Sequence, residues 1–204
     1  MLEAIEESMT HPETMSVPDP GILTFYQNLS ERRIWLDMAV DNTFLEYARN
    51  IMRWNTEDAG KPVAERKPIW LYIFNYGGGA DFMWMFADII ASSETPVYTV
   101  NVGKCCSAAA IIFMSGHKRF MFPTATVLIH EGSGEIVGDA VKVLDQAESY
   151  KSMVRQMHNY ILAHTKIPPA TLTKKKNNDW ELDADTCMKY GVCDQIVTKL
   201  SEVI

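Results

Sequence analysis

An α/β layered fold with mainly parallel strands is predicted by the order of apolar segments along the chain. Some of these segments are short and almost wholly apolar, as strands covered on both faces are. Others place apolar residues at helical spacing, and the two kinds alternate. Parallel strands need a crossover segment between them, so this alternation favours a mostly parallel sheet covered by helices.

The first predicted strand is Arg33–Leu36, a short β-like run. The first helix is expected at residues 42–54, where Phe44, Ala48 and Ile51 lie at helical spacing. A polar loop then separates this helix from the next apolar segment.

The second predicted strand, residues 68–74, is nearly all apolar and ends close to three glycines at positions 77–79. Residues 80–91 return to a helical period, and residues 96–102 have strand character again. Strand, glycine turn, helix and strand therefore follow one another in the first half of the chain.

Three further elements complete the prediction. Residues 108–114 are expected to form a buried helix, and residues 126–129 a strand. Residues 139–164 are expected to form one long amphipathic helix, because apolar residues recur at helical spacing from Val143 to Ile161.

One folded domain is expected. The chain has 204 residues, of which 47% are hydrophobic, and this suffices for one sizeable core. The first twenty residues contain three prolines and many acidic or small polar residues without an apolar period. Residues 1–21 are therefore predicted to form a flexible N-terminal arm, and residues 22–204 the single domain.

The composition argues against several classes of function. The formal net charge of -7 leaves no basic face for nucleic acid, and no apolar run approaches the roughly 20 residues of a membrane-spanning helix. The N-terminus is acidic where a secretory signal is basic. Four cysteines without a CxxC pair indicate neither a zinc site nor a disulfide scaffold, so we expect a cytoplasmic protein without a metal.

Gly77–Gly79 form the first candidate site, directly after a predicted strand. Glycines there let backbone N–H groups approach a ligand, and the following helix adds a dipole that favours negative charge. The segment is a candidate oxyanion hole, although the same glycines also suit an ordinary tight turn. No phosphate-binding glycine motif is present, so a nucleotide site is not predicted.

Ser107 is the second candidate, because it lies between a predicted strand and the helix at residues 108–114. A serine at such a turn can present its hydroxyl beside N–H groups aimed at a developing oxyanion. The alternative is a simple helix N-cap, a position that serine favours. Cys105 and Cys106 are rival nucleophiles, but small packed thiols are the expected role in this apolar turn.

His130 is the third candidate, since it follows a predicted strand and precedes a loop that contains glycine. A histidine there can act as a general base, and a purely structural histidine is the alternative. The other histidines have less suitable settings: His11 in the arm, His117 in a surface-like turn at residues 116–119, and His158 and His164 on the long helix.

A histidine base needs an acceptor for its other ring nitrogen, and a carboxylate is the usual choice. The sequence pattern by itself leaves five carboxylates of the last quarter open: Asp179, Glu181, Asp183, Asp185 and Asp194.

Several ordered segments resemble the proteolytic subunit of the Clp protease, ClpP, of peptidase family S14. The likeness runs from about Ser30 to the C-terminus. The matching pairs are residues 69–79 with the family segment IYLYINSPGG, residues 102–110 with GQAASMGA, residues 127–130 with MIH, and residues 187–194 with AxEYGLID.

The resemblance implies roles for five residues. It places the family's nucleophile on Ser107, its histidine on His130 and its acid on Asp179. A glycine stands where the family has a proline before its two glycines, and with this pairing the N–H groups of Gly79 and Ala108 are the implied oxyanion donors.

The resemblance also implies a fold, an activity and partners. The fold would be ClpP/crotonase-like, with repeated β-β-α units and a long handle helix at residues 139–164. The activity would be that of a serine endopeptidase acting on unfolded proteins and peptides, inside a tetradecamer of two stacked heptameric rings. An AAA+ Clp ATPase would unfold substrates and hydrolyse ATP, while this chain would need no cofactor.

The sequence departs from the family pattern at three further places. Glu131-Gly132 replaces the glutamine and proline after the histidine, and residues 174–176, shortly before Asp179, are all lysine. The arm shows little likeness to the family's axial loop, so docking to the ATPase is the least supported of the implied properties.

Three alternative functions are kept. The chain could be a noncatalytic structural subunit of a mixed ring, against which its intact triad argues. It could be a crotonase-like enzyme of acyl-CoA, a related fold that uses glycine-turn N–H groups without a serine nucleophile. It could be a membrane-associated or signal-peptide-type peptidase of the same superfamily, which the lack of an apolar anchor disfavours.

Overall fold

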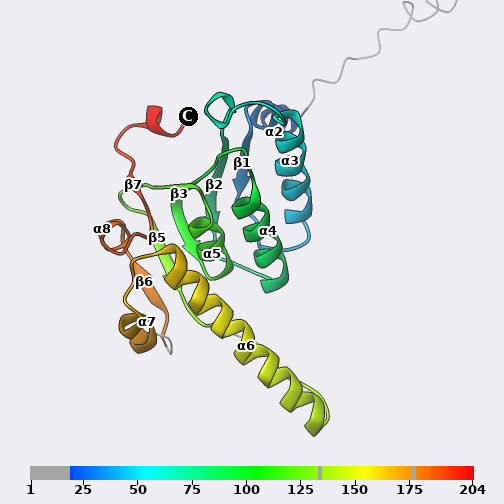
Figure 1. Ribbon diagram of the computed structural model, residues 1–204, viewed down its shortest axis with the longest axis vertical. Helices are drawn as coiled ribbons and strands as arrows, with labels where there is room; N and C mark the ends of the chain where they lie inside the picture. Colours follow the sequence, from blue (N-terminus) through cyan, green and yellow to red (C-terminus); the bar gives the residue numbers. More distant parts are fainter. Residues whose placement is uncertain (1–18, 133–134, 176–177) are drawn as a thin grey trace, which may run out of the picture. The chain divides into compact units, whose positions relative to one another are not determined.

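The computed structural model describes residues 19–132, 135–175 and 178–204 (Figure 1). The chain divides into two units, one ending at Glu31 and one running from Arg32 to Ile204, and each is described by itself. His11 and nearly all of the predicted arm lie outside the described residues. The predicted domain boundary at residue 22 stays a prediction.

Helix α2 (Pro20–Ser30) is the described element of the first unit. The carboxylate of Asp19 accepts a hydrogen bond from the Gly21 amide at 2.6 Å, and Pro20 occupies the first helical position. Both features are typical of a helix N-terminus. The helix begins two residues before the predicted start of order at Ile22.

The second unit is built on a seven-stranded sheet. Its strands are β1 (Arg33–Leu36), β2 (Ile69–Asn75), β3 (Val97–Cys106), β4 (Lys118–Met121), β5 (Thr126–Ile129), β6 (Trp180–Leu182) and β7 (Gln195–Ile196). Its helices are α3 (Phe44–Glu57), α4 (Ala80–Ser92), α5 (Ala108–Met114), α6 (Ala140–His164), α7 (Pro169–Lys175) and α8 (Ala184–Lys189), with 3-10 turns at η1 (Val63–Glu65) and η2 (Leu200–Glu202).

Strands β1, β2, β3, β4 and β7 lie side by side in this order, and each neighbouring pair is parallel. The long strand β3 has two partners on one side: its first half pairs with β4, and its end at Lys104–Cys106 pairs with β5, also in parallel. Strand β6 is antiparallel to β5. The prediction of an α/β fold with mainly parallel pairing is confirmed.

The predicted elements are all found close to their expected bounds, and β1, α5 and β5 match them to the residue. The elements that were not predicted are helix α2, the 3-10 turns η1 and η2, and the short elements β4, α7, β6, α8 and β7. The predicted surface-like turn at residues 116–119 is found but is shorter: Gly116 and His117 lie in it, and Lys118 begins β4. His117 is exposed, as expected, although its Nδ1 accepts the Val97 N–H at 3.0 Å and partial burial of the ring lowers its pKa.

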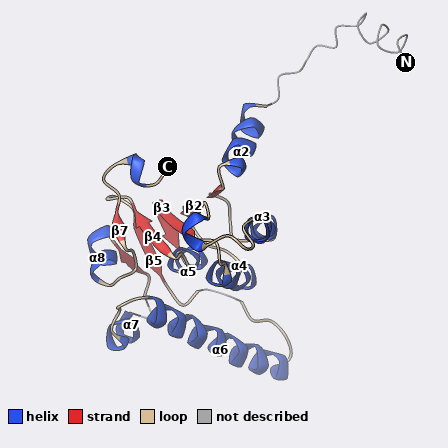
Figure 2. Ribbon diagram, turned by 45° about the horizontal axis from the view of Figure 1, so that its top comes forward, coloured by secondary structure: helices blue, strands red, loops and turns tan. Residues whose placement is uncertain are grey.

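Much of the core lies between the sheet and helices α3, α4 and α5, which Figure 2 shows against one side of it. A second buried cluster gathers Tyr72, Val100, Phe120, Val197 and Val203, none of them from these helices. All seven residues of α5 are buried, as its continuous apolar sequence requires. Helix α6 behaves differently. Its buried residues are Met157 and Ile161, both in its second half, and its first half extends past the rest of the unit (Figure 1).

The exposed first half of α6 carries large apolar side chains. Val141 is 68% and Leu144 is 70% exposed, and Val137 just before the helix is 74% exposed. The apolar side chains in the first half of this helix are therefore not covered by any of the described residues. Exposed apolar side chains that cluster on one element mark an interaction surface more often than a free one.

A buried ion pair fastens the start of β1 to the end of α3. The Asp58 carboxylate is 1% exposed and accepts two hydrogen bonds from Arg32, at 2.5 and 3.1 Å. Lys61 and Thr95 bind the same carboxylate at 2.8 and 3.1 Å. The Arg32 guanidinium holds the pKa of the Asp58 carboxyl well below its usual value.

Removing the Asp58 carboxylate by Asp58→Ala is expected to lower the free energy of unfolding by about 3–5 kcal/mol, because the buried Arg32 guanidinium loses its two short hydrogen bonds and keeps the longer 3.5 Å contact with the half-exposed Glu57. Urea unfolding followed by circular dichroism measures this change. The matched control is Glu46→Ala in the same helix, whose partner Arg49 and own side chain are 68% and 62% exposed. Similar losses in both variants would contradict the interpretation.

Among the described residues, no helix combines the length and the apolar character that crossing a bilayer demands. All four cysteines are free and buried.

Candidate active site

Ser107, His130 and Asp179 lie at the same edge of the sheet. Strands β3 and β5 are parallel and end there, and β6 begins there because it is antiparallel to β5. The register pairs Cys106 with Leu128, and Ile129 with Trp180. Each of the three residues directly adjoins one of these paired positions.

Ser107 occupies a strained turn between β3 and α5. Its φ of 57° and ψ of -123° are rare for a residue with a side chain, and such strain is concentrated at functional sites. Its amide donates to the Leu128 carbonyl at 2.9 Å, which fixes the turn beside β5. Ser107 stands at the N-cap position of α5, but its hydroxyl makes no capping hydrogen bond.

The neighbouring thiols are packed in the core. Cys105 is 0% and Cys106 is 6% exposed. Burial raises the pKa of both thiols, that of Cys105 well above its ordinary value. Because the thiolate is the nucleophilic form of cysteine, both are poor nucleophiles here.

The glycine turn packs directly against Ser107. A Cβ on Gly77 would lie 2.7 Å from the Ser107 Cβ and 3.2 Å from the Ala108 nitrogen, so only glycine fits there. Gly77 also has a φ of 102°, which side chains rarely adopt. The turn therefore brings its backbone to the point where α5 begins.

The amide of Gly79 does not face this site. It donates to the Val40 carbonyl at 2.7 Å, while the Val40 amide donates to the Gly77 carbonyl at 3.0 Å. This bonding makes a parallel bridge between Val40 and Gly78. The expectation that the Gly79 N–H binds an oxyanion is therefore corrected: that N–H is already committed to the chain beside β2.

Gly78 presents its amide in the opposite direction. In a bridge of this kind the polar groups of the two flanking residues point to the partner, and those of the central residue point away from it. Because β3 lies on the other side of β2, the Gly78 N–H faces the Ser107 turn. Neither this N–H nor that of Ala108 has a hydrogen-bond acceptor within residues 19–132, 135–175 and 178–204.

His130 follows β5 and has one ring nitrogen near a carboxylate. Its Nδ1 is 3.6 Å from Oδ1 of Asp179, which is longer than a hydrogen bond. Its Nε2 is buried and has no partner in the described part of the chain, so it makes no hydrogen bond to Ser107. In enzymes without substrate, such contacts are often long and shorten in the reacting complex.

The other four carboxylates that the sequence left open have different surroundings. Glu181 binds Lys104 at 2.5 Å, and Asp194 binds Arg119 through both of its oxygens. Asp183 caps α8 by accepting the Thr186 amide at 2.8 Å, and Asp185 is exposed in the first turn of α8. Of the five carboxylates, Asp179 is the one that lies beside the His130 ring in the described part of the chain.

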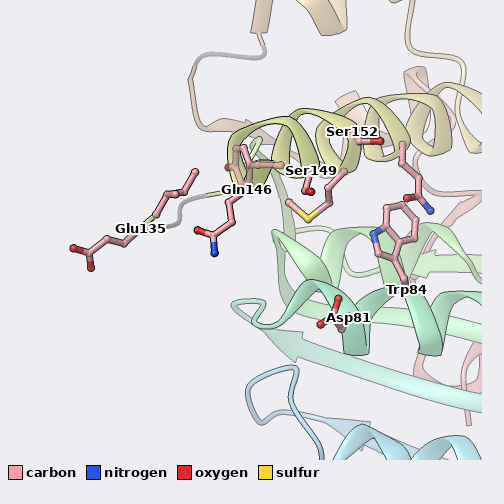
Figure 3. Close-up of a pocket in the computed structure, with 11 residues that line it drawn as sticks. Asp81, Trp84, Glu135, Gln146, Ser149 and Ser152 are labelled. Atoms are coloured by element: carbon pink, nitrogen blue, oxygen red, sulfur yellow. The ribbon is translucent and has the colours of Figure 1, made fainter. Parts of the chain in front are cut away.

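A cavity of about 1000 Å³ lies beside this edge, between α4 and α6. Figure 3 shows Asp81 and Trp84 rising from α4 toward the side chains of α6, and Glu135 directed away from them. Gly132, two residues after His130, also lines the cavity, whereas Ser107, His130 and Asp179 do not.

The sequence model of the Clp protease family matches residues 22–200 of this chain. The chain belongs to the Clp protease family. Among similar members is "ATP-dependent Clp protease proteolytic subunit 2" of Treponema denticola, 30% identical over 139 residues, which are 67% of this chain and 70% of that protein.

A second member of the Clp protease family matches along nearly the whole chain. It is "ATP-dependent Clp protease proteolytic subunit 2" of Treponema pallidum, 26% identical over 204 residues, which are 98% of this chain and 97% of that protein. The solved structure of a ClpP1 mutant from Listeria monocytogenes superposes with a TM-score of 0.75, covering 89% of this chain and 99% of that one at 17% identity. That likeness establishes the ClpP/crotonase-like fold.

Proposed function

We propose that this member of the Clp protease family is a serine endopeptidase subunit that cleaves unfolded proteins and peptides. The observation that carries the proposal is the open Nε2 of His130, which is buried and has no partner among the described residues, on a ring whose Nδ1 lies beside Asp179. A buried ring nitrogen without a partner costs free energy unless a reacting group uses it. The strained Ser107 turn, with its uncommitted hydroxyl, supports the same assignment.

The proposed reaction is acyl transfer. His130 Nε2 takes the proton of the Ser107 hydroxyl while Oγ attacks the peptide carbonyl carbon. Asp179 orients the ring through Nδ1 and stabilises the imidazolium. The imidazolium then gives its proton to the leaving amine, which leaves an ester on Ser107. Water, deprotonated by His130, hydrolyses this ester and restores the serine.

The N–H groups of Gly78 and Ala108 are the proposed oxyanion donors. The developing oxyanion needs donors that are already in place and are not used elsewhere. Gly78 meets this requirement and Gly79 does not, because the Gly79 N–H binds Val40. Ala108 is the first residue of α5, so the helix dipole also favours negative charge at its amide.

The proposed assembly is two stacked heptameric rings that enclose a chamber, served by an AAA+ Clp ATPase that hydrolyses ATP. The exposed apolar first half of α6 supports contact with another subunit, and the relatives bear the words "ATP-dependent" in their names. A cytoplasmic location, and action without a cofactor or metal in this chain, belong to the same proposal.

A fluorophosphonate probe tests the chemistry, because it is expected to label Ser107 covalently in the purified protein. Mass spectrometry of the digest identifies the labelled residue, and light scattering of the same sample measures the particle mass. Labelling at Ser107 in a particle far larger than one chain agrees with the proposal. Labelling elsewhere, or none, would refute the triad.

The noncatalytic subunit is the second candidate, favoured by the long 3.6 Å contact and by the absence of a Ser107–His130 hydrogen bond within the described residues. It predicts a large particle that does not react with the probe. A crotonase-like enzyme would instead bind CoA thioesters, which equilibrium dialysis detects.

A further inference from the structure

We propose that Tyr150 and His158 of α6 are positioning residues that hold His130 in place through Glu131. This inference rests on the proposed function, since it concerns the residue assigned there as the base. Tyr150 and His158 both contact Glu131, the residue directly after His130.

Glu131 is held at two points by α6. The Tyr150 hydroxyl donates to the main-chain carbonyl of Glu131 at 2.9 Å. The Nε2 of His158 lies 3.3 Å from Oε1 of the Glu131 carboxylate, and the two side chains are 23% and 29% exposed. One contact fixes the peptide group and the other fixes the side chain, so together they define where this residue lies.

No other cation binds this carboxylate among the described residues. Lys151 and Arg155 line the same cavity of about 440 Å³, but both pair with Glu148, at 3.4 and 3.5 Å. The lining residue from α7 is Thr173, which has no charge. His158 is therefore the group through which α6 holds the Glu131 side chain.

His130 needs this support because its own ring is weakly tied. The contact with Asp179 is 3.6 Å long, Asp179 is 72% exposed, and Nε2 has no partner within the described ranges. Gly132 follows at a φ of 88°, so the chain turns sharply within two residues of the base. Without the contacts to α6, rotation at Glu131 would move His130 relative to Ser107.

Loss of these contacts should lower kcat more than it changes KM, because a displaced base slows proton transfer without removing a substrate contact. In the assembled full-length protein, His158→Leu and Tyr150→Phe are each expected to lower the rate of fluorophosphonate labelling and kcat for a fluorogenic peptide about tenfold, with KM nearly unchanged. Glu131→Gln is expected to retain both rates, because its amide oxygen still accepts from His158.

Lys151→Leu is the matched control, since Lys151 lines the same cavity but contacts Glu148. His158→Leu combined with Glu131→Leu is expected to cost no more than either change by itself, as for residues that act as one unit. Particle mass and circular dichroism show whether each variant assembles. If His158→Leu fails to fold, Tyr150→Phe decides, because it removes only one hydroxyl.

Labelling rates of Tyr150→Phe and His158→Leu equal to that of the unmodified protein would overturn the inference, and so would an equal loss in Lys151→Leu. A loss that appears only in KM would also overturn it. Failure of the proposed function gives a different result, because the unmodified protein itself would then not be labelled at Ser107.

Discussion

Ser107→Ala is expected to lower the turnover of a fluorogenic peptide by about 10⁶-fold, the loss known for removal of the serine from other triads. The variant keeps the fold, because the Ser107 hydroxyl makes no capping bond and the Leu128 contact uses the amide. The measurement is the steady-state rate with protein of matched particle mass.

The matched control is Ser92→Ala, which removes an exposed hydroxyl that binds the Asp88 carbonyl at 2.6 Å at the end of α4. It should leave turnover unchanged. Residual cleavage by Ser107→Ala at the rate of the control would end the serine mechanism. Transfer of activity to Cys106 is not expected, because burial raises the pKa of its thiol.

Gly78→Ala is expected to lower kcat by about 10²–10³-fold, the usual cost of losing one oxyanion donor. A Cβ at this position would lie 2.4 Å from the Val40 carbonyl oxygen and 2.7 Å from its nitrogen. Both are backbone atoms, so the bridge must open and the Gly78 amide must turn. Peptide turnover and thermal unfolding of the variant measure the two consequences.

Gly79→Ala is the control that separates the two candidate donors. Gly79 has an extended φ of -68°, and its added Cβ would come within 3.2 Å only of a Phe82 ring carbon, which can move. Its N–H would keep the bond to Val40. We expect turnover within a few-fold of the unmodified protein, in line with a donor not used by the reaction. A larger loss of turnover in Gly79→Ala than in Gly78→Ala would instead favour the Gly79 N–H as the oxyanion donor.

The long strands and helices were predictable because their apolar periods reflect burial on defined faces. Helix α5 illustrates this, since an unbroken apolar run can only be a buried element. Strand β4 was not predictable: Lys118 and Arg119 are polar, and the segment becomes a strand through its pairing with β3. The short elements β6, β7, α7 and α8 have too few residues to show a period.

The setting of Ser107 at a strand-to-helix turn and of His130 at a strand end followed from local pattern. Asp179 followed only from the family resemblance, since five carboxylates were equally available. In the fold its place beside His130 comes from the antiparallel pairing of β6 with β5. Such a pairing joins distant segments, and no local pattern encodes it.

The sequence by itself determined the order of the longer elements of the second unit, the family resemblance and the settings of two of the proposed catalytic residues, Ser107 and His130. When the family segment IYLYINSPGG is aligned from Ile69, its last glycine falls on Gly78. Aligning it instead so that its last glycine falls on Gly79 pointed to the wrong amide. The tertiary structure decided which amide faces Ser107. The physical reason is that N–H directions alternate along an extended chain, and the bridge to Val40, from a different segment, sets which N–H is left as the proposed oxyanion donor.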